Sequence, residues 1–237
     1  MNGEKPNPAG AFTSRMTRGE TAAAVCYLAV HLWLLPKLLF ALPQTASLSD
    51  ADINLICYAV GFLYMLVFAG RFLRRDFDPV CDDTFYTFLQ IVICYGMMIA
   101  FNLILNTLLT LLPVENPNSA AVIEMAGQEF GKTAAMAVFL APLLEELIFR
   151  AGIFGFLRPY SRTLAYLTSM LLFALYHVWG YALSDPIYWL YLLQYLPVSW
   201  LLCRCYERCN SIWGSIFLHM TINGISLYSL SFVSEYL

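Results

Sequence analysis

The chain is organised around long apolar stretches separated by short polar segments. Seven stretches of about 20 residues contain few charged side chains, and they lie at 21–43, 53–70, 84–113, 133–157, 162–181, 187–206 and 211–233. A helix needs about 20 mostly apolar residues to cross a bilayer, because backbone N–H and C=O groups in lipid must be hydrogen-bonded within the protein. The pattern predicts an all-α, polytopic bundle of seven transmembrane helices, or eight if the long third stretch contains a break.

The composition agrees with this prediction and excludes two broad classes of protein. Of the 237 residues, 60% are hydrophobic and only 12% are charged, whereas about 25% are charged in an average soluble domain. An ordinary cytosolic protein of this size needs a more polar surface. The net charge of -3 gives no reason to expect a nucleic-acid partner, which favours a basic patch. The expected surroundings are therefore a lipid bilayer.

The basic residues predict how the chain is oriented in the membrane. Lys and Arg accumulate in short loops on the cytoplasmic side. With seven spans, ten of the thirteen basic residues fall on one side, namely Lys5, Arg15, Arg18, Arg71, Arg74, Arg75, Arg158, Arg162, Arg204 and Arg208. We therefore predict a cytoplasmic N-terminus and an external C-terminus. An eighth span within 84–113 would reverse the later assignments and lose this agreement.

Few ionisable residues lie inside the predicted spans. They are His31, Lys37, Glu145, Glu146, Arg150, His177 and His219. A charge at the centre of a bilayer costs about 2.5–3.5 kcal/mol on insertion scales, so residues of this kind usually mark a functional site. Lys37 lies near a span end and can extend to the interface. His31 stands alone among apolar residues, and we predict a packed, neutral histidine there.

The fourth stretch contains two adjacent acids in the segment APLLEELIFR at 141–150. On a helix, Glu146 and Arg150 are four residues apart and can pair, whereas Glu145 is rotated by about 100° and faces a different neighbour. A structural ion pair needs only one of the two glutamates. The second carboxylate would then be buried at a cost without a partner, which favours a chemical role for Glu145.

Two later stretches add histidines at helical spacing. FALYH at 173–177 places Phe173 and His177 on one helix face, and HMTIN at 219–223 does the same for His219 and Asn223. A carboxylate, two imidazoles and an amide can supply a general base for water and donors for an oxyanion, as amide hydrolysis requires. One glutamate and two histidines can also hold a catalytic zinc ion. The residues alone leave both chemistries open.

The three motifs together resemble the CPBP family (CAAX protease and bacteriocin-processing, also called ABI) of intramembrane endopeptidases, which includes the type II CAAX prenyl endopeptidases. The family pattern is two glutamates followed three residues later by arginine, then Phe-x3-His, then His-x3-Asn. This chain has all three in that order between residues 145 and 223, without a departure at any motif position. Each motif alone would be weak, and their order makes the resemblance specific.

The resemblance implies a role for each matching residue. Glu145 would activate water, His219 with Asn223 would stabilise the oxyanion, and His177 would position the water. The supporting residues would be Glu146, Arg150 and Phe173. Members are described both as metalloendopeptidases and as glutamate-dependent enzymes without a metal. We favour the mechanism without a cofactor, and the alternative is zinc held by Glu145, His177 and His219.

The composition along the chain and the resemblance together suggest an organisation and a location. We expect a flexible polar tail at 1–20, N-terminal transmembrane helices at 21–130, and a catalytic core at 131–237 with a water-accessible cavity inside the membrane. The short length and small loops favour a bacterial member in the plasma membrane. Its substrate would be a peptide or a membrane protein, with recognition of a prenyl group left open.

Two other functions remain as alternatives at this stage. The same fold could serve as a non-catalytic scaffold or as a bacteriocin self-immunity protein, although the intact motifs argue against loss of catalysis. A proton-coupled transporter could use Glu145 and His219 as a relay. Inverted repeats would favour a transporter, and the sequence has none that we can detect.

Overall fold

The computed structural model describes residues 12–109, 111 and 115–236. Within these ranges every regular element is a helix, which confirms the all-α prediction. Four helical segments of the described chain are long and apolar enough to cross a membrane, namely Arg18–Ala41, Asp50–Asp82, Thr84–Leu109 and Arg162–Ala182. The other three predicted spans are also helical, and the total number of membrane crossings stays a prediction.

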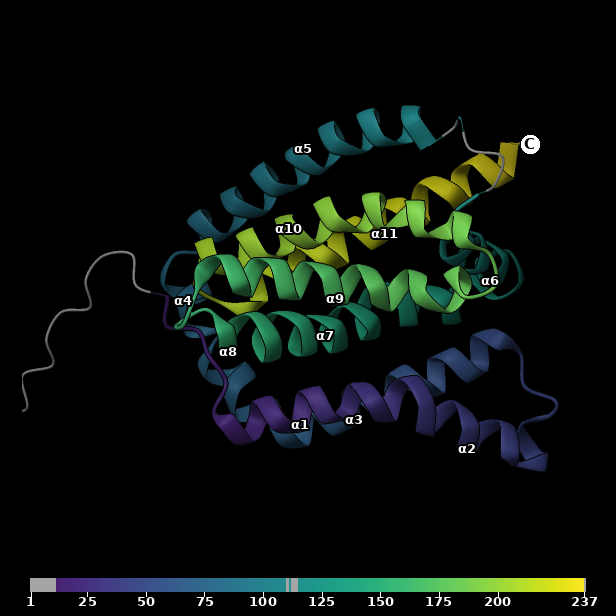
Figure 1. The fold of residues 1–237 in the computed structure, drawn as a ribbon, viewed down its shortest axis with the longest axis horizontal. Helices are drawn as coiled ribbons and strands as arrows, with labels where there is room; N and C mark the ends of the chain where they lie inside the picture. Colours follow the sequence, from purple (N-terminus) through teal and green to yellow (C-terminus); the bar gives the residue numbers. More distant parts are fainter. Residues whose placement is uncertain (1–11, 110, 112–114, 237) are drawn as a thin grey trace, which may run out of the picture.

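The N-terminal helices form a layer along one side of the molecule (Figure 1). Thr17 and Glu20 start the first helix with a capping box, in which each side chain accepts a hydrogen bond from the other residue's backbone N–H. Ser49 and Asp52 cap the third helix in the same way. The elements are α1 (Arg18–Ala29), the π-helical η1 (Val30–Leu34), α2 (Leu35–Ala41), the short η2 (Pro43–Thr45) and α3 (Asp50–Arg75).

The segment before α1 is fixed to the bundle. The Ser14 hydroxyl donates to the Asp76 carboxylate at 2.8 Å, and the Ser14 carbonyl accepts from the Tyr206 hydroxyl at 2.7 Å. Ser14, within the predicted tail at 1–20, thus contacts the residue that ends α3 and a tyrosine of α10. Residues 1–11 lie outside the described residues.

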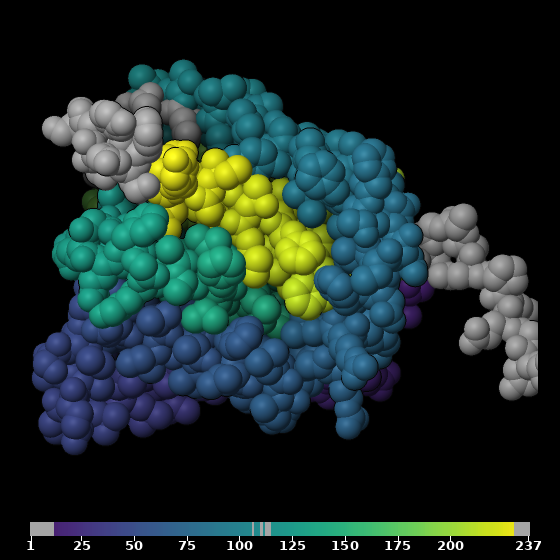
Figure 2. Space-filling view, turned by 180° about the vertical axis from the view of Figure 1, so that it is seen from behind, coloured from purple at the N-terminus to yellow at the C-terminus, as the bar shows by residue number. Residues whose placement is uncertain are grey.

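Helix α5 (Thr84–Leu109) follows the short α4 (Asp78–Asp82) and lies along α10 and α11 at the edge of the bundle (Figures 1 and 2). It runs without interruption from Thr84 to Leu109, so this part of the predicted stretch at 84–113 contains no break. Large apolar side chains such as Phe85 and Leu103 are exposed on it. Such an apolar surface is expected where a helix faces lipid.

The predicted span at 133–157 forms the centre of the molecule. Residues 141–155 are all buried, and this segment contacts α1 and α3 on one side and α9 to α11 on the other. Two π-helical segments interrupt the predicted span at 133–157, and such wide turns often occur at functional sites. The elements are α6 (Pro117–Ala134), which kinks at Glu129, then η3 (Ala135–Leu140), α7 (Ala141–Glu145), η4 (Glu146–Phe154) and α8 (Gly155–Leu157).

The last helices cover the central segment from the other side. The turn between α10 and α11 is tight, because Asn210 adopts the left-handed conformation (φ 48°) that ends α10. In the view from behind, α11 lies between α5 and α6 (Figure 2). These elements are α9 (Arg162–Ala182), the short η5 (Pro186–Tyr191), α10 (Leu192–Cys209) and α11 (Ile212–Tyr236).

Candidate functional site

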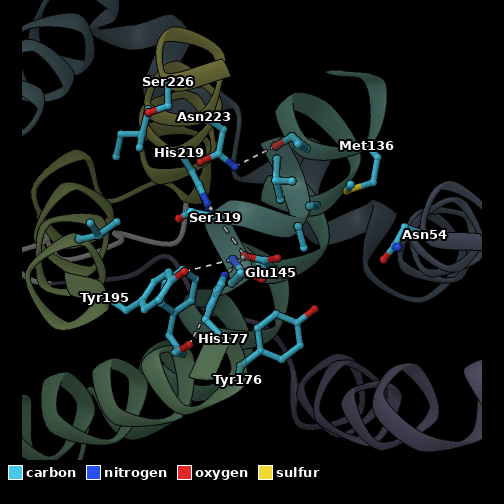
Figure 3. A pocket seen from close by; sticks show the side chains of 18 of the residues that line it. Asn54, Ser119, Met136, Glu145, Tyr176, His177, Tyr195, His219, Asn223 and Ser226 are labelled. Atoms are coloured by element: carbon cyan, nitrogen blue, oxygen red, sulfur yellow. Dashed lines mark hydrogen bonds and ion pairs between the residues drawn. The ribbon is translucent and has the colours of Figure 1, made fainter. Parts of the chain in front are cut away.

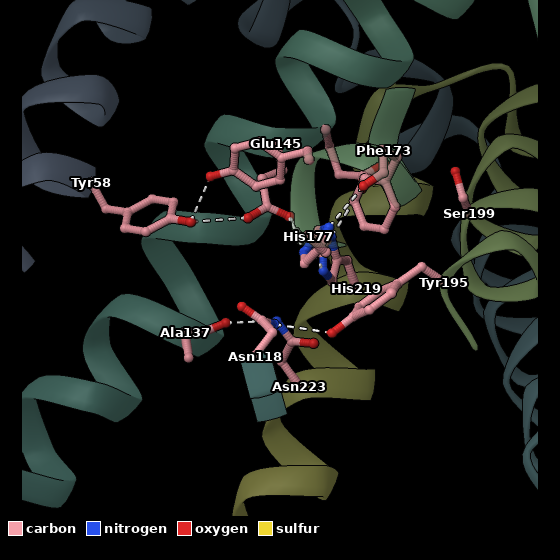
Figure 4. Close-up of polar contacts among 12 residues, drawn as sticks. Tyr58, Asn118, Ala137, Glu145, Phe173, His177, Tyr195, Ser199, His219 and Asn223 are labelled. Carbon is pink, nitrogen blue, oxygen red and sulfur yellow. Dashed lines mark hydrogen bonds and ion pairs between the residues drawn. The ribbon is translucent and has the colours of Figure 1, made fainter. Parts of the chain in front are cut away.

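Glu145 lies at the junction between α7 and the π-helical η4, with only 4% of its surface exposed. Its Oε1 accepts a hydrogen bond from the Tyr58 hydroxyl at 3.2 Å. Its Oε2 lies 3.8 Å from Nε2 of His177 and 3.9 Å from Nε2 of His219. The structure thus brings together residues from three of the predicted spans around one carboxylate oxygen (Figure 4).

The orientation of His177 is set by its own helix. Nδ1 lies 2.8 Å from the carbonyl oxygen of Phe173, one turn earlier on α9. A carbonyl can only accept, so Nδ1 carries the proton and Nε2 of the neutral ring turns a lone pair toward Glu145. The ring also stacks on Tyr195, with centroids 4.6 Å apart and planes at 21°. Both contacts hold the imidazole in place.

His219 is backed by a carboxylate instead of a carbonyl. Its Nδ1 lies 2.9 Å from Oε1 of Glu146, and the same oxygen lies 3.1 Å from Nη1 of Arg150. A carboxylate paired with arginine accepts hydrogen bonds, so Nδ1 of His219 is the donor and Nε2 faces Glu145. This arrangement is the same kind of carboxylate and imidazole pairing that orients a histidine in a catalytic triad.

Arg150 forms the expected pair with Glu146 and also contacts Ser199 and Phe173. Its Nη2 donates to the Ser199 hydroxyl at 2.9 Å, and its guanidinium lies 4.1 Å from the ring centroid of Phe173. Both ion-pair partners are completely buried. A buried charge is stable only when it is paired and hydrogen-bonded. Arg150 and Glu146 therefore form a layer behind His219.

Asn223 follows His219 by one turn of α11. Its Nδ2 donates to the carbonyl oxygen of Ala137 in η3 at 2.8 Å. An amide nitrogen has two hydrogens, so one N–H is available for another partner. Asn223 lines the same cavity as Glu145, His177 and His219 (Figure 3).

That cavity has a volume of about 590 Å³, which lies within the range usual for ligand sites. Among the described residues that line it, Glu145 is the one carboxylate, and no Lys or Arg is present. Its other polar walls are largely neutral and include Asn54, Asn102, Asn118, Ser119 and Gln194. Such walls suit an uncharged polar ligand better than an ionic one.

Several residues of the site were not predicted from the sequence. Tyr58 and Tyr176 bond each other at 2.8 Å, and Asn118 donates to the Tyr195 hydroxyl at 3.1 Å. His31, expected as a packed neutral residue, is buried but lies 3.2 Å from the Tyr176 hydroxyl and lines the cavity. Tyrosine is common in membrane helices. Its presence therefore gave no signal.

The fit of a zinc ion depends on the spacing of its three candidate ligands. Zinc bonds of 2.0–2.1 Å in a tetrahedral site place neighbouring ligand atoms about 3.3 Å apart. Here the distances from Glu145 Oε2 to the two Nε2 atoms are 3.8 and 3.9 Å. No group of three His, Cys, Asp or Glu in the described part of the chain is close enough to hold a metal ion. As they lie here, these residues do not fit zinc.

Residues 129–225 match the family described as Type II CAAX prenyl endopeptidase Rce1-like. This region is therefore Rce1-like. The matched range contains all three motifs, so the family resemblance predicted from them is confirmed. The apolar helices indicate an integral membrane protein, and its residues 129–225 are similar to a family of endopeptidases.

Two curated bacterial proteins are similar to the chain. UPF0177 protein YxdF of Lactococcus lactis subsp. lactis (strain IL1403) is 37% identical over 84 residues, which cover 35% of this chain and 42% of YxdF. UPF0177 protein YvdC of the same strain is 23% identical over 204 residues, which cover 81% of this chain and 74% of YvdC. No solved structure has a significant match. The chain thus spans less than half of YxdF and about three quarters of YvdC.

Proposed function

We propose that the protein is an intramembrane endopeptidase that hydrolyses a peptide bond in a membrane-associated or prenylated substrate, with Glu145 as the general base. One observation carries the proposal. Oε2 of Glu145 and Nε2 of His177 and His219 face one another at 3.8 and 3.9 Å, and this buried group lines a cavity of about 590 Å³. The Rce1-like match of residues 129–225 supports it at the level of the family.

The distances from Oε2 of Glu145 to the two histidine Nε2 atoms leave room for a water molecule between them. Direct hydrogen bonds are about 2.7–3.2 Å long, so 3.8 and 3.9 Å are too long for a contact between the three atoms. A water between them can donate one hydrogen to Oε2 of Glu145 and the other to an imidazole Nε2. These bonds orient the water oxygen for attack, and the carboxylate takes its proton.

The reaction balances with Glu145 as the one proton carrier. The water oxygen bonds to the scissile carbonyl carbon while its proton moves to Glu145, and the carbonyl oxygen becomes an oxyanion. Glu145 then gives this proton to the leaving nitrogen as the C–N bond breaks. The products are a carboxylic acid and an amine, and the carboxylate of Glu145 is regenerated.

Asn223 and His219 are the proposed oxyanion donors. Asn223 has a second amide N–H beside its bond to Ala137, and no hydrogen bond from it to another described residue is seen. His219 can donate from Nε2 only when both ring nitrogens carry protons. The carboxylate of Glu146 on Nδ1 stabilises such an imidazolium better than the carbonyl that backs His177 does. We therefore assign the charged role to His219 and the water-positioning role to His177.

The experiment measures cleavage by the protein in proteoliposomes. The probes are a quenched-fluorescent peptide with a farnesylated C-terminal CAAX sequence, its unprenylated counterpart, and a peptide library. Glu145→Gln is expected to lower kcat by roughly 100- to 10,000-fold, the usual contribution of a general base. The matched control is Glu124→Gln, which removes an exposed carboxylate of α6 and should cleave like the wild type.

Two outcomes would overturn the proposal. Cleavage that survives Glu145→Gln would remove the assigned base. A wild-type protein that cleaves none of the probes would favour the non-catalytic scaffold or self-immunity function instead.

A further inference from the structure

A chain of hydrogen bonds runs from the N-terminal helices to Glu145. It begins at His31 in η1, passes through Tyr176 on α9 and Tyr58 on α3, and ends at Oε1 of Glu145. We propose that His31, Tyr176 and Tyr58 are positioning residues that hold the Glu145 carboxylate in its working orientation. This inference rests on the proposed function, because it assumes that Glu145 is the general base.

The direction of the last bond follows from the chemistry of its two groups. The Tyr58 hydroxyl lies 3.2 Å from Oε1 of Glu145. An ionised carboxylate can only accept, so Tyr58 uses its single hydrogen here. The bond is made to Oε1, whereas the two histidines face Oε2. Tyr58 therefore fixes one carboxylate oxygen and leaves the other for the proposed chemistry.

The remaining directions follow in turn. The hydroxyls of Tyr58 and Tyr176 are 2.8 Å apart, and Tyr58 has no second hydrogen to give, so Tyr176 donates. The Tyr176 oxygen must then accept from Nε2 of His31, which is 3.2 Å away. Nδ1 of His31 is buried without a hydrogen-bond partner among the described residues, as expected for the unprotonated nitrogen of a neutral ring. Every donor in the chain thus points toward Glu145.

Such an alignment strengthens each bond. Hydrogen bonds in series polarise one another, and the effect is larger where the surroundings are apolar. The rings are also held by packing, since His31 contacts Tyr58 edge-on with centroids 4.8 Å apart. Loss of one hydroxyl would let the carboxylate rotate, and a misplacement of about 1 Å can cost roughly 100-fold in rate.

Two of the three proposed positioning residues lie outside the Rce1-like range. His31 and Tyr58 precede residue 129, where that match begins. The N-terminal helices therefore complete the site by fixing the orientation of its base. This assigns a function to His31, whose apolar neighbours in the sequence had suggested only packing.

The test removes the hydrogen-bonding groups of the three residues and keeps an aromatic ring at each position. Tyr58→Phe is expected to lower kcat for the farnesylated CAAX peptide by roughly 10- to 100-fold, the usual effect of a hydrogen bond to a charged group, with KM unchanged. Tyr176→Phe and His31→Phe should have smaller effects on kcat. Both effects should vanish in the Tyr58→Phe background, because they act through Tyr58. The control is Tyr64→Phe on the same helix, whose hydroxyl bonds the Ala23 carbonyl.

A second measurement does not need a substrate. Infrared difference spectra of wild type and Glu145→Gln identify the carboxyl band of Glu145. This band is expected to shift in Tyr58→Phe and, by less, in Tyr176→Phe, and to stay in place in Tyr64→Phe.

An unshifted band in Tyr58→Phe, or a Tyr58→Phe variant with the wild-type kcat, would overturn the inference. So would effects of Tyr176→Phe and Tyr58→Phe that simply multiply. A wild-type protein without cleavage activity would overturn the proposed function instead, and the infrared band would still decide whether the chain of hydrogen bonds positions Glu145.

Discussion

At the scale of single residues, the two histidines of the site differ in the group behind them. His177 is held by a backbone carbonyl of its own helix, whereas His219 is held by Glu146, which pairs with Arg150. The two acids of the EE pair are therefore not interchangeable. Glu145 lines the cavity, and Glu146 acts through His219 and Arg150.

The buried pair of Glu146 and Arg150 leads to a prediction that separates stability from catalysis. Arg150→Met leaves a buried carboxylate without its cation and is expected to lower the unfolding free energy by about 3–5 kcal/mol. Adding Glu146→Gln removes the unpaired charge and should recover part of the loss in thermal stability. Cleavage should stay low in the double variant, because His219 no longer has a carboxylate behind it.

Thermal unfolding in detergent and the peptide cleavage assay measure the two quantities. Arg71→Gln is the control, since Arg71 is exposed on α3 and should leave both unchanged. Full recovery of cleavage in the double variant would contradict the role given to Glu146.

The spacing of the three facing atoms predicts insensitivity to chelators. Because Oε2 of Glu145 and the two Nε2 atoms are farther apart than zinc ligands, prolonged dialysis against a chelator is expected to leave kcat and the melting temperature of the wild type unchanged. Loss of cleavage that added zinc restores would show instead that His177 and His219 close around a metal.

The charged residues of the site could be predicted from the sequence, because a charge in lipid is costly. The neutral polar residues of the site could not. The five ionisable residues of the three motifs all lie in or directly behind the cavity. Tyr58, Tyr176 and Asn118 carry no charge, and polar groups of this kind occur in many membrane helices to bond a neighbour. Only their contacts in the structure connect them to Glu145.

At the scale of helices, the sequence predicted the length of a membrane helix but not the π-helical segments. The stretch predicted at 162–181 is α9, Arg162–Ala182, because lipid thickness fixes the length of such a helix. In the π-helical η3 and η4, backbone N–H groups bond the carbonyl five residues earlier, not four. The pattern of apolar residues does not predict where this happens. These segments bracket Glu145.

The contact between α3 and α7 depends on a glycine. A Cβ atom added to Gly61 would lie 2.6 Å from Leu144 and 2.9 Å from the Tyr27 ring. Gly61→Ala is therefore expected to push α3 away from α7, to lower stability by about 1–3 kcal/mol as overpacking does, and to reduce kcat by moving Tyr58 from Glu145. The control is Gly70→Ala on the same helix, where nothing lies within 4 Å of the added atom.

Stability is measured by thermal unfolding, and kcat by the peptide cleavage assay. Since Ala favours a helix over Gly by up to about 1 kcal/mol, Gly70→Ala should be neutral or stabilising. A Gly61→Ala variant that behaves like Gly70→Ala would show that α3 and α7 tolerate a wider separation.

At the scale of the whole molecule, the segments that carry most of the basic residues meet at one end of the bundle. Thr13 bonds Asn210, and Asp76 accepts from the N–H of Ile212. Arg158 and Arg162 both contact Glu207. The N-terminal segment, the end of α3, the turn before α9 and the turn after α10 therefore share this end.

The opposite end collects the segments in between. Lys132 pairs with Asp52 near the start of α3, and Asn116 bonds Gln194 near the start of α10. These contacts place the two ends of α3 at opposite ends of the bundle. The number of membrane crossings and their orientation stay predictions from the apolar stretches and the basic residues.

We therefore expect the end that contains Asp76 to face the cytoplasm, and native cysteines offer a direct measurement. Cys81 is exposed in α4 beside this end, so a membrane-impermeant maleimide should label it only after cells are permeabilised. In a Cys81→Ser background, Ser47→Cys places a thiol at an exposed position of the opposite end and should be labelled in intact cells. Cys81→Ser alone is the control for labelling of other thiols. Labelling of Cys81 in intact cells would mean that the basic residues face outward, against the tendency of Lys and Arg to remain in the cytoplasm.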